Sequence, residues 1–202
     1  MRPSGIRWLS TELARCARRA IGTTPSYTAA MTASPEFRPL SLCVLTVSDS
    51  RTPANDSSGD YLCDALSDAG HHLHARALLP DDKYQLRAQV SAWIADADVD
   101  GIVVTGGTGF TGRDSTPEAL LPLLDKQMPG FGELFRALSF EEIGTSTLQS
   151  RAFAGLANGS FVFALPGSTS ACRTAWEKII RAQLDARTKP CNLVNLKPRL
   201  KE

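Results

Sequence analysis

The stretch from Val103 to Ala119 reads VVTGGTGFTGRDSTPEA. An apolar run over residues 101–104 predicts a buried strand, and it is followed by four glycines within seven residues and then by a helix start. Such a loop at a helix N-terminus presents backbone N–H groups to an anion, and glycine lets a phosphate approach the main chain. We therefore expect a substrate to bind at residues 106–109.

The end of this stretch predicts a short helix over residues 117–124. Ser115 and Glu118 have the spacing of a capping box, and Pro117 in the first turn loses no hydrogen bond that it could have made. Asp114 directly precedes the predicted cap. Its carboxylate is therefore expected at the rim of the pocket.

Two common glycine motifs do not fit the loop. Residues 107–112 have the letters of the Gly-x-Gly-x-x-Gly dinucleotide fingerprint, but about three strands' worth of chain precede them, whereas that fingerprint follows a first strand. A nucleotide P-loop would need Gly-Lys-Ser/Thr where Arg113-Asp114 stand. A glycine turn that serves only the chain's path remains an alternative.

Composition limits the class of protein. The 202 residues are 43% hydrophobic and 21% charged, with a formal net charge of +1, which gives no electrostatic basis for binding nucleic acid or a membrane surface. No apolar run reaches the roughly 18 residues of a membrane span. The cysteines have no Cys-x-x-Cys spacing, so we expect reduced thiols in a cytoplasmic protein, with Cys43, Cys63 and Cys172 in the core.

The chain divides by composition near residue 40. Residues 1–39 begin rich in arginine and poor in acidic residues and become rich in Ser, Thr and Pro; no apolar run follows that would make them a secretory signal. We expect residues 1–39 to be a disordered or weakly helical N-terminal extension, with Met31 as a candidate true start. Residues 40–202 are expected to form a single domain.

Strand and helix patterns alternate along this domain. Strands are expected at 42–47, 72–79, 101–104 and 160–165, and helices at 60–68, 82–97, 117–124, 132–142, 146–157 and from about 170 to 184. Trp93 falls on the buried stripe of its helix, whereas the histidines at 71, 72 and 74 are expected at the surface rather than at a metal site. The alternation predicts a three-layer α/β/α fold with a mainly parallel sheet.

In such a sheet the loops that follow the strands meet at one edge. Two of these loops, at 106–109 and 166–168, are suited to phosphates, and Asp81 and Asp114 could bind a divalent cation or orient a phosphate nucleophile. Either aspartate could instead be a helix cap or a turn residue. The expected substrate-binding residues are Ser48, Thr105, Gly106, Gly107, Thr108, Gly109, Pro166, Gly167 and Ser168.

One apolar face on the expected 132–142 helix has no obvious cover. Phe131, Leu134, Phe135 and Leu138 recur on this face, and we expect another subunit to bury it.

Several segments resemble motifs of the MoaB/MogA family of molybdenum cofactor biosynthesis proteins. They are TGGTG at 105–109, RDSTPEA at 113–119, PGFGE at 129–133 and PGS at 166–168. The segments LSFEEIGTSTLQSR at 138–151, ACRTAW at 171–176 and QLDARTKPCN at 183–192 resemble the bacterial B-type branch. The resemblance covers residues 40–197 and does not include the extension.

This resemblance implies a molybdopterin-binding domain that transfers an adenylyl group. ATP and molybdopterin would be the substrates, Mg²⁺ the cofactor, and adenylyl-molybdopterin and pyrophosphate the products. It also implies a homo-trimer or homo-hexamer and a downstream metal-inserting protein as partner. Active members have carboxylates in a Pro-Asp and in an Arg-Asp-x-Thr-Pro segment, which match Asp81 and Asp114 as catalytic residues and magnesium ligands. Some B-type members lack these carboxylates, so a non-catalytic pterin-binding or scaffold protein is the alternative.

Overall fold

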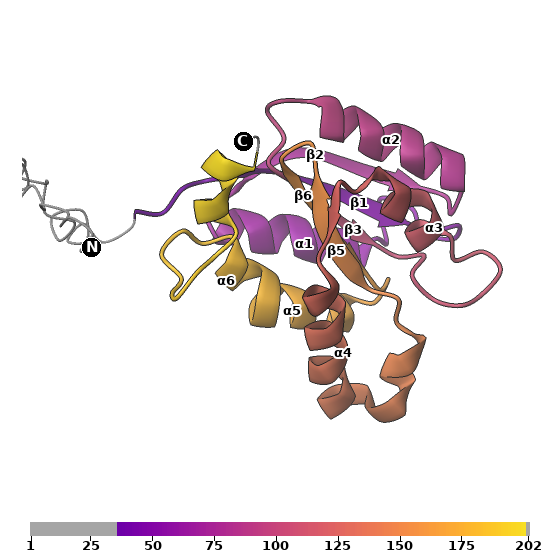
Figure 1. Ribbon diagram of the computed structural model, residues 1–202. Coiled ribbons are helices and arrows are strands. Elements are labelled where there is room, and N and C mark those ends of the chain that lie inside the picture. Colours follow the sequence, from indigo (N-terminus) through magenta and orange to yellow (C-terminus); the bar gives the residue numbers. More distant parts are fainter. Residues whose placement is uncertain (1–35, 201–202) are drawn as a thin grey trace, which may run out of the picture. The chain divides into compact units, whose positions relative to one another are not determined.

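Six strands form one sheet in the order β2-β1-β3-β6-β5-β4 (Figure 1). The computed structural model describes residues 36–200. Strands β1, β2, β3 and β6 run parallel, whereas β5 is antiparallel to β6 and β4 is antiparallel to β5. The bounds are β1 Ser41–Val47, β2 His72–Leu79, β3 Gly101–Thr105, β4 Lys126–Gln127, β5 Phe153–Ala157 and β6 Ser160–Leu165.

Helices cover both faces of this sheet, so the predicted three-layer α/β fold is confirmed. Figure 1 shows α2 and α3 on one face and α1 and α5 on the other. The bounds are α1 Ser57–Asp68, α2 Lys83–Ala95, α3 Thr116–Leu120, η2 Leu121–Leu123, α4 Pro129–Ile143, η3 Gly144–Gln149, α5 Thr169–Ala175, the π-helical turn η4 Trp176–Ile180, α6 Arg181–Gln183 and η5 Val194–Arg199.

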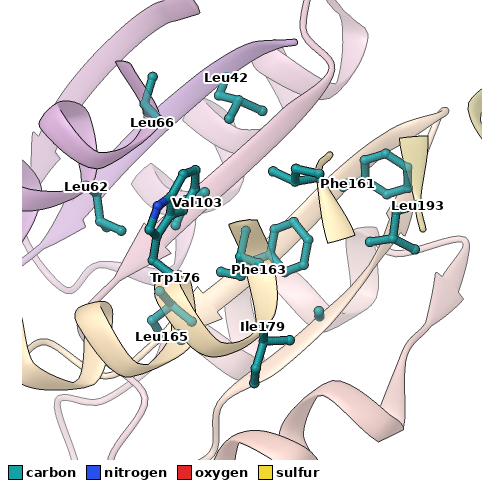
Figure 2. Close-up of a cluster of buried hydrophobic side chains, with 14 of the residues drawn as sticks. Leu42, Leu62, Leu66, Val103, Phe161, Phe163, Leu165, Trp176, Ile179 and Leu193 are labelled. Atoms are coloured by element: carbon teal, nitrogen blue, oxygen red, sulfur yellow. The ribbon is translucent and has the colours of Figure 1, made fainter. Parts of the chain in front are cut away.

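The continuous apolar strands are explained by two cores. In β1, Leu42 and Val44 pack with α1, α4 and α5, while Cys43 and Leu45 pack with α2 and α3, because successive side chains point to opposite faces. Figure 2 shows the first core, in which Trp176 lies among side chains from the sheet and from α1. Both faces are therefore buried, and the strand pattern has no polar alternation.

The carboxyl ends of the parallel strands are level. The register pairs Val47 with Leu79, Thr46 with Thr105, and Thr105 with Leu165. The loops after β1, β2, β3 and β6 therefore begin at one edge, as expected for an open α/β sheet.

The predicted helix over residues 146–157 is wrong. Residues 144–149 form η3, and Phe153–Ala157 is strand β5. The FAGLA sequence is poor in β-branched residues, but pairing with β6 supplies its backbone hydrogen bonds, and Asn158 and Gly159, with φ of 47° and 84°, form the two-residue turn between the strands. Here tertiary pairing outweighs local preference.

Other expectations hold with small changes. The helix expected at 82–97 ends at Ala95, and short β4 was not expected. Trp93, Cys43, Cys63 and Cys172 are buried as predicted. The expected extension lies largely outside the described residues. Residues 36–40, the first that the structure describes, have no regular secondary structure.

The three histidines differ in their surroundings. His72 and His74 are exposed, as expected. His71 is buried instead, and its Nδ1 accepts a hydrogen bond from the Leu40 N–H at 3.2 Å. Among residues 36–200, no helix is long and apolar enough to cross a membrane.

The expectation for the α4 face is partly wrong. Phe131 and Phe135 are 4% and 1% exposed and belong to the chain's own core, where Phe131 contacts Phe163 with ring centroids 5.5 Å apart. Leu138 is partly buried against the same core. On α4, the large apolar side chains that remain exposed are those of Leu134, Phe140 and Ile143.

Candidate active site

A cavity of about 500 Å³ lies at the carboxyl edge of the sheet. The loops after β1, β3 and β6 form one wall, and α4, η3 and the residues after η3 form the other. Asp81 lies outside this cavity, in an adjoining depression of about 470 Å³, and Asp114 lines both. The structure thus brings together, on the cavity wall, Ser48, Thr105, Gly106, Gly107, Thr108, Gly109, Asp114, Pro166, Gly167 and Ser168.

Gly106 makes the tight turn at the end of β3. Its φ is +110°, and a Cβ there would lie 2.1 Å from the Val47 carbonyl oxygen, so only glycine fits. Its N–H donates to the Leu165 carbonyl at 2.9 Å and so continues the pairing of β3 with β6. Gly106 therefore shapes the loop, and its amide is already engaged.

Each of the next two glycines lies against the carboxylate of one of the two aspartates. A Cβ on Gly107, whose φ is +63°, would lie 2.4 Å from Asp81 Oδ2, and one on Gly109 would lie 2.8 Å from Asp114 Oδ2. Each carboxylate thus rests against the backbone of one glycine. A side chain at either glycine would therefore displace a carboxylate.

Replacing Gly107 should therefore be costly. We expect Gly107→Ala to lower the free energy of unfolding by at least about 2 kcal/mol, because it combines left-handed strain with contacts at 2.4 Å to Asp81 and Thr116. Gly112→Ala is the matched control, since a Cβ there meets nothing within 4 Å, and it should change stability by less than about 0.5 kcal/mol. Urea unfolding measures both; equal effects would contradict this explanation.

Asp81 is held by the residue that was expected to cap α3. Its Oδ1 accepts hydrogen bonds from the Ser115 N–H at 3.1 Å and the Ser115 hydroxyl at 2.5 Å. The capping box is therefore wrong, because Ser115 makes no side-chain cap. Burial raises the pKa of Asp81, the Ser115 bonds oppose this rise, and the charges of Asp114 and Asp49 add to it.

Asp114 has the opposite electrostatic environment. Its Oδ2 accepts a hydrogen bond from the Thr111 N–H at 2.7 Å. Burial alone would raise the pKa of Asp114, but hydrogen bonds from Thr111 and Gly109 and the charge of Arg151 lower it. The pKa values of the two aspartates are thus shifted in opposite directions, as is common where neighbouring acids have different roles.

Asp49 is a third acid at this edge, and no motif in the sequence indicated it. Its carboxylate binds Arg113 at 2.6 and 2.9 Å, and its Oδ1 also accepts a hydrogen bond from the Asp81 N–H at 3.1 Å. The hydrogen bond from Arg113, and to a smaller extent that from the Asp81 N–H, lower the pKa of Asp49. The loops after β1, β2 and β3 are joined through this one side chain.

Arg51 provides positive charge in the cavity wall and was also missed. It donates to the Gly167 carbonyl at 2.8 Å, to Asp56 at 3.1 Å and to the Ser58 hydroxyl. Asp56 is fully buried and caps α1 by accepting a hydrogen bond from the Gly59 N–H at 3.0 Å. Because Gly167 is 116 residues from Arg51, no local pattern could have predicted this contact.

Two hydroxyl groups shape the loop after β6. The Thr105 hydroxyl donates to the Pro166 carbonyl at 2.9 Å. The Ser168 hydroxyl accepts a hydrogen bond from the Ala171 N–H at 3.2 Å and so caps α5. Ser168 thus has a structural role beside its expected contact with substrate.

Magnesium fits the aspartates only with help from substrate. Within the described residues, no group of three or more His, Cys, Asp or Glu side chains could enclose a metal ion. Mg²⁺ is commonly held by one or two carboxylates together with substrate phosphates and water. Asp81 and Asp114 meet that requirement if phosphate oxygens complete the set.

Comparisons with known proteins identify the family. Residues 43–186 match the family model described as "Probable molybdopterin binding domain". The chain is 60% identical over 159 residues to molybdenum cofactor biosynthesis protein B of Escherichia coli (strain K12), covering 79% of this chain and 94% of that protein. It is 44% identical over 151 residues to the protein of the same name from Staphylococcus carnosus (strain TM300), covering 73% and 88%.

Solved structures give the same result. A crystal structure of a molybdenum cofactor biosynthesis protein B has a TM-score of 0.73 at 38% identity, covering 81% of this chain and 97% of the other. The tungsten cofactor synthesizing protein MoaB from Pyrococcus furiosus has a TM-score of 0.68 at 35% identity, covering 82% and 99%. The chain therefore belongs to the MoaB/MogA family and acts in molybdenum cofactor biosynthesis.

Proposed function

We propose that this protein transfers an adenylyl group from ATP to molybdopterin, giving adenylyl-molybdopterin and pyrophosphate. The observation that carries the proposal is the pair of aspartates, Asp81 and Asp114, each resting on a glycine of the loop that lines the cavity. A protein that only bound a pterin would not need two carboxylates beside a phosphate-sized glycine loop.

The reaction asks mainly for alignment and charge neutralisation. A phosphate oxygen of molybdopterin attacks the α-phosphorus of ATP in line, and the bond to the bridging oxygen breaks as pyrophosphate leaves with the electron pair. Mg²⁺ bound by Asp81, Asp114 and phosphate oxygens would neutralise the charge that develops on the leaving group.

The protein's own groups divide this work. The amides of Gly107 and Thr108 are assigned to phosphate oxygens, since the Gly106 amide is engaged by Leu165 and the Gly109 amide by Asp114. Arg51 contributes positive charge to the same cavity and also holds the Gly167 carbonyl, which keeps the loop after β6 at its wall. Asp114, which lines both the cavity and the depression, orients the reacting phosphates.

Assembly and location are part of the proposal. A homo-trimer or homo-hexamer is supported by the exposed apolar side chains of Leu134, Phe140, Ile143 and Leu148 on α4 and η3. A downstream metal-inserting protein would receive the product. The free, buried thiols of Cys43, Cys63 and Cys172 support a cytoplasmic location.

The decisive test is pyrophosphate release. Purified protein is mixed with ATP, Mg²⁺ and molybdopterin, and pyrophosphate and adenylyl-molybdopterin are measured by a coupled assay and by mass spectrometry. We expect both products in equal amounts, and neither when molybdopterin or Mg²⁺ is left out. Protein that binds molybdopterin but releases no pyrophosphate would instead be a pterin-binding scaffold.

A further inference from the structure

Arg151 joins the glycine loop to the opposite wall of the cavity. It lies between η3 and β5, next to Gln149 and Ser150, which line the cavity. Its Nε donates to the Gly109 carbonyl at 2.7 Å, and its Nη2 donates to the Asp114 carbonyl at 2.9 Å. Its backbone N–H donates to the Thr108 carbonyl at 3.0 Å. One residue therefore holds both ends of segment 109–114.

The segment has little other support. Its internal turn consists of the Thr111 N–H donating to Asp114 Oδ2 at 2.7 Å and the Asp114 N–H donating to the Thr111 carbonyl at 3.0 Å. Its other polar link is the ion pair of Arg113 with Asp49, whose side chains are 68% and 43% exposed. This pair is bidentate, but it is screened by solvent and anchors the segment at Arg113 alone. The hydrogen bonds from Arg151 are thus the contacts that fix both ends of this segment.

We propose that Arg151 is a positioning residue, which fixes segment 109–114 and thereby the location of the Asp114 carboxylate relative to the cavity. The consequence for turnover rests on the proposed adenylyl transfer, whereas the ordering of the loop does not. The Arg151 side chain is itself oriented by an ion pair with Glu118 of α3 and by the Phe110 ring, whose centroid lies 5.3 Å from its guanidinium carbon.

The geometry requires arginine rather than any cation. The planar guanidinium directs its N–H groups in fixed directions, so it can meet two carbonyl groups five residues apart and a carboxylate at once. A lysine ammonium is a single point of charge and cannot span both ends of the segment. Arg151→Lys therefore keeps the charge and removes the bridge.

The chain contains a matched control. Arg87 of α2 donates through Nε to the Ala119 carbonyl at 3.1 Å and through Nη2 to the Glu118 carbonyl at 2.8 Å, and it lies 5.8 Å from the Tyr84 ring centroid. Its contacts have the same form as those of Arg151, but they hold α3 rather than the glycine loop. Arg87→Lys thus reports the general effect of losing such a bridge.

Two measurements test the proposal on the full chain. Since a misplacement of about 1 Å can cost roughly 10²-fold in rate, Arg151→Lys should lower kcat by about 10- to 100-fold, with KM for ATP changed by less than about threefold. Hydrogen exchange of the amides at 109–114 should become faster in Arg151→Lys. Arg87→Lys should alter kcat by less than about threefold and leave that exchange unchanged.

Equal loss of kcat in the two variants, or unchanged exchange at 109–114 in Arg151→Lys, would overturn the proposal. If wild-type protein releases no pyrophosphate, the proposed adenylyl transfer fails and the exchange measurement alone decides the role of Arg151. Should Arg151→Lys not fold, Glu118→Ala removes the side-chain acceptor that orients the guanidinium. Faster exchange at 109–114 then supports the proposal, and no change contradicts it.

Discussion

Asp114→Asn should lower turnover by a factor on the order of 10² to 10³, because loss of one charged group at a phosphate site commonly costs about 3 to 4 kcal/mol of barrier. The substitution keeps the shape of the side chain, and the amide oxygen of the asparagine can still accept the hydrogen bond from the Thr111 N–H. What it removes is the charge that, in the proposed reaction, orients Mg²⁺ and the reacting phosphates. The loss should therefore appear in kcat.

Steady-state kinetics of pyrophosphate release, with molybdopterin affinity measured separately, check this expectation. We expect the affinity for molybdopterin to change by less than about tenfold, since in the proposed reaction Asp114 acts on the step in which charge moves to pyrophosphate. Normal turnover at saturating molybdopterin, with weakened binding, would make Asp114 a substrate anchor instead.

Asp81→Asn should lower turnover by the same order, but the two variants should differ in stability. The pKa of Asp81 is raised above the ordinary value of 3.8, so its ionisation opposes folding; this cost is absent below pH 3.8 and complete above the raised folded pKa. The pKa of Asp114 is lowered, so its ionisation favours folding above pH 3.8, and that contribution is lost as pH falls through the folded pKa.

Melting temperatures at neutral pH distinguish the two cases. Asp81→Asn should leave Tm unchanged or raise it, whereas Asp114→Asn should lower it. An inactive Asp81→Asn protein with undiminished Tm would show that the carboxylate is retained for function rather than for folding. A fall in Tm at neutral pH for Asp81→Asn would contradict the inferred direction of its pKa.

Phe135→Ala should lower the free energy of unfolding by about 3 to 5 kcal/mol, the usual cost of emptying a buried aromatic site. Phe135 is 1% exposed and stacks with Phe131 at a centroid distance of 6.4 Å. A charged residue at this position, as in Phe135→Glu, would disrupt the fold of the chain itself and so could not test assembly. Urea unfolding followed by circular dichroism measures the loss.

Leu134 provides the control on the same helix. It is 47% exposed, so Leu134→Glu should change the stability of the subunit by no more than about 0.5 kcal/mol. If a partner subunit covers this face of α4, light scattering should detect smaller species for Leu134→Glu. A large loss of stability in Leu134→Glu, or a negligible one in Phe135→Ala, would contradict the burial of this helix.

Much of the fold can be predicted from the sequence because its signals are local. The apolar runs of β1, β3 and β6 require burial on both faces, and that burial indicates a parallel sheet between helix layers. Phe153–Ala157 gave no such signal, since Ala and Gly are weak strand formers and the pairing with β6 decides its structure. The burial of Phe135 likewise depends on which face of α4 meets the sheet.

The site likewise contains some residues that the sequence predicts and others that it does not. The glycine loop follows β3, Asp81 comes soon after β2, and Asp114 lies at the far end of the glycine loop, so strand order and polarity bring them to one edge. The roles of Ser115, Arg51 and Arg151 depend on partners 34, 116 and 37 to 42 residues away, and no spacing within the sequence encodes such contacts. Ser115 shows the effect plainly, because a buried Asp81 takes the hydroxyl that its local sequence assigns to the helix.

The reversed direction of β5 has a consequence for how this site is built. In a wholly parallel sheet, the segment that enters a strand lies at the far edge, away from substrate. Because β5 runs antiparallel to β6, the segment that enters it, residues 150–152, begins at the edge where β3 and β6 leave the sheet. The hairpin turn at Asn158 and Gly159 therefore places the start of one strand at the edge where the parallel strands end. This placement lets Arg151, which precedes β5, contact the glycine loop.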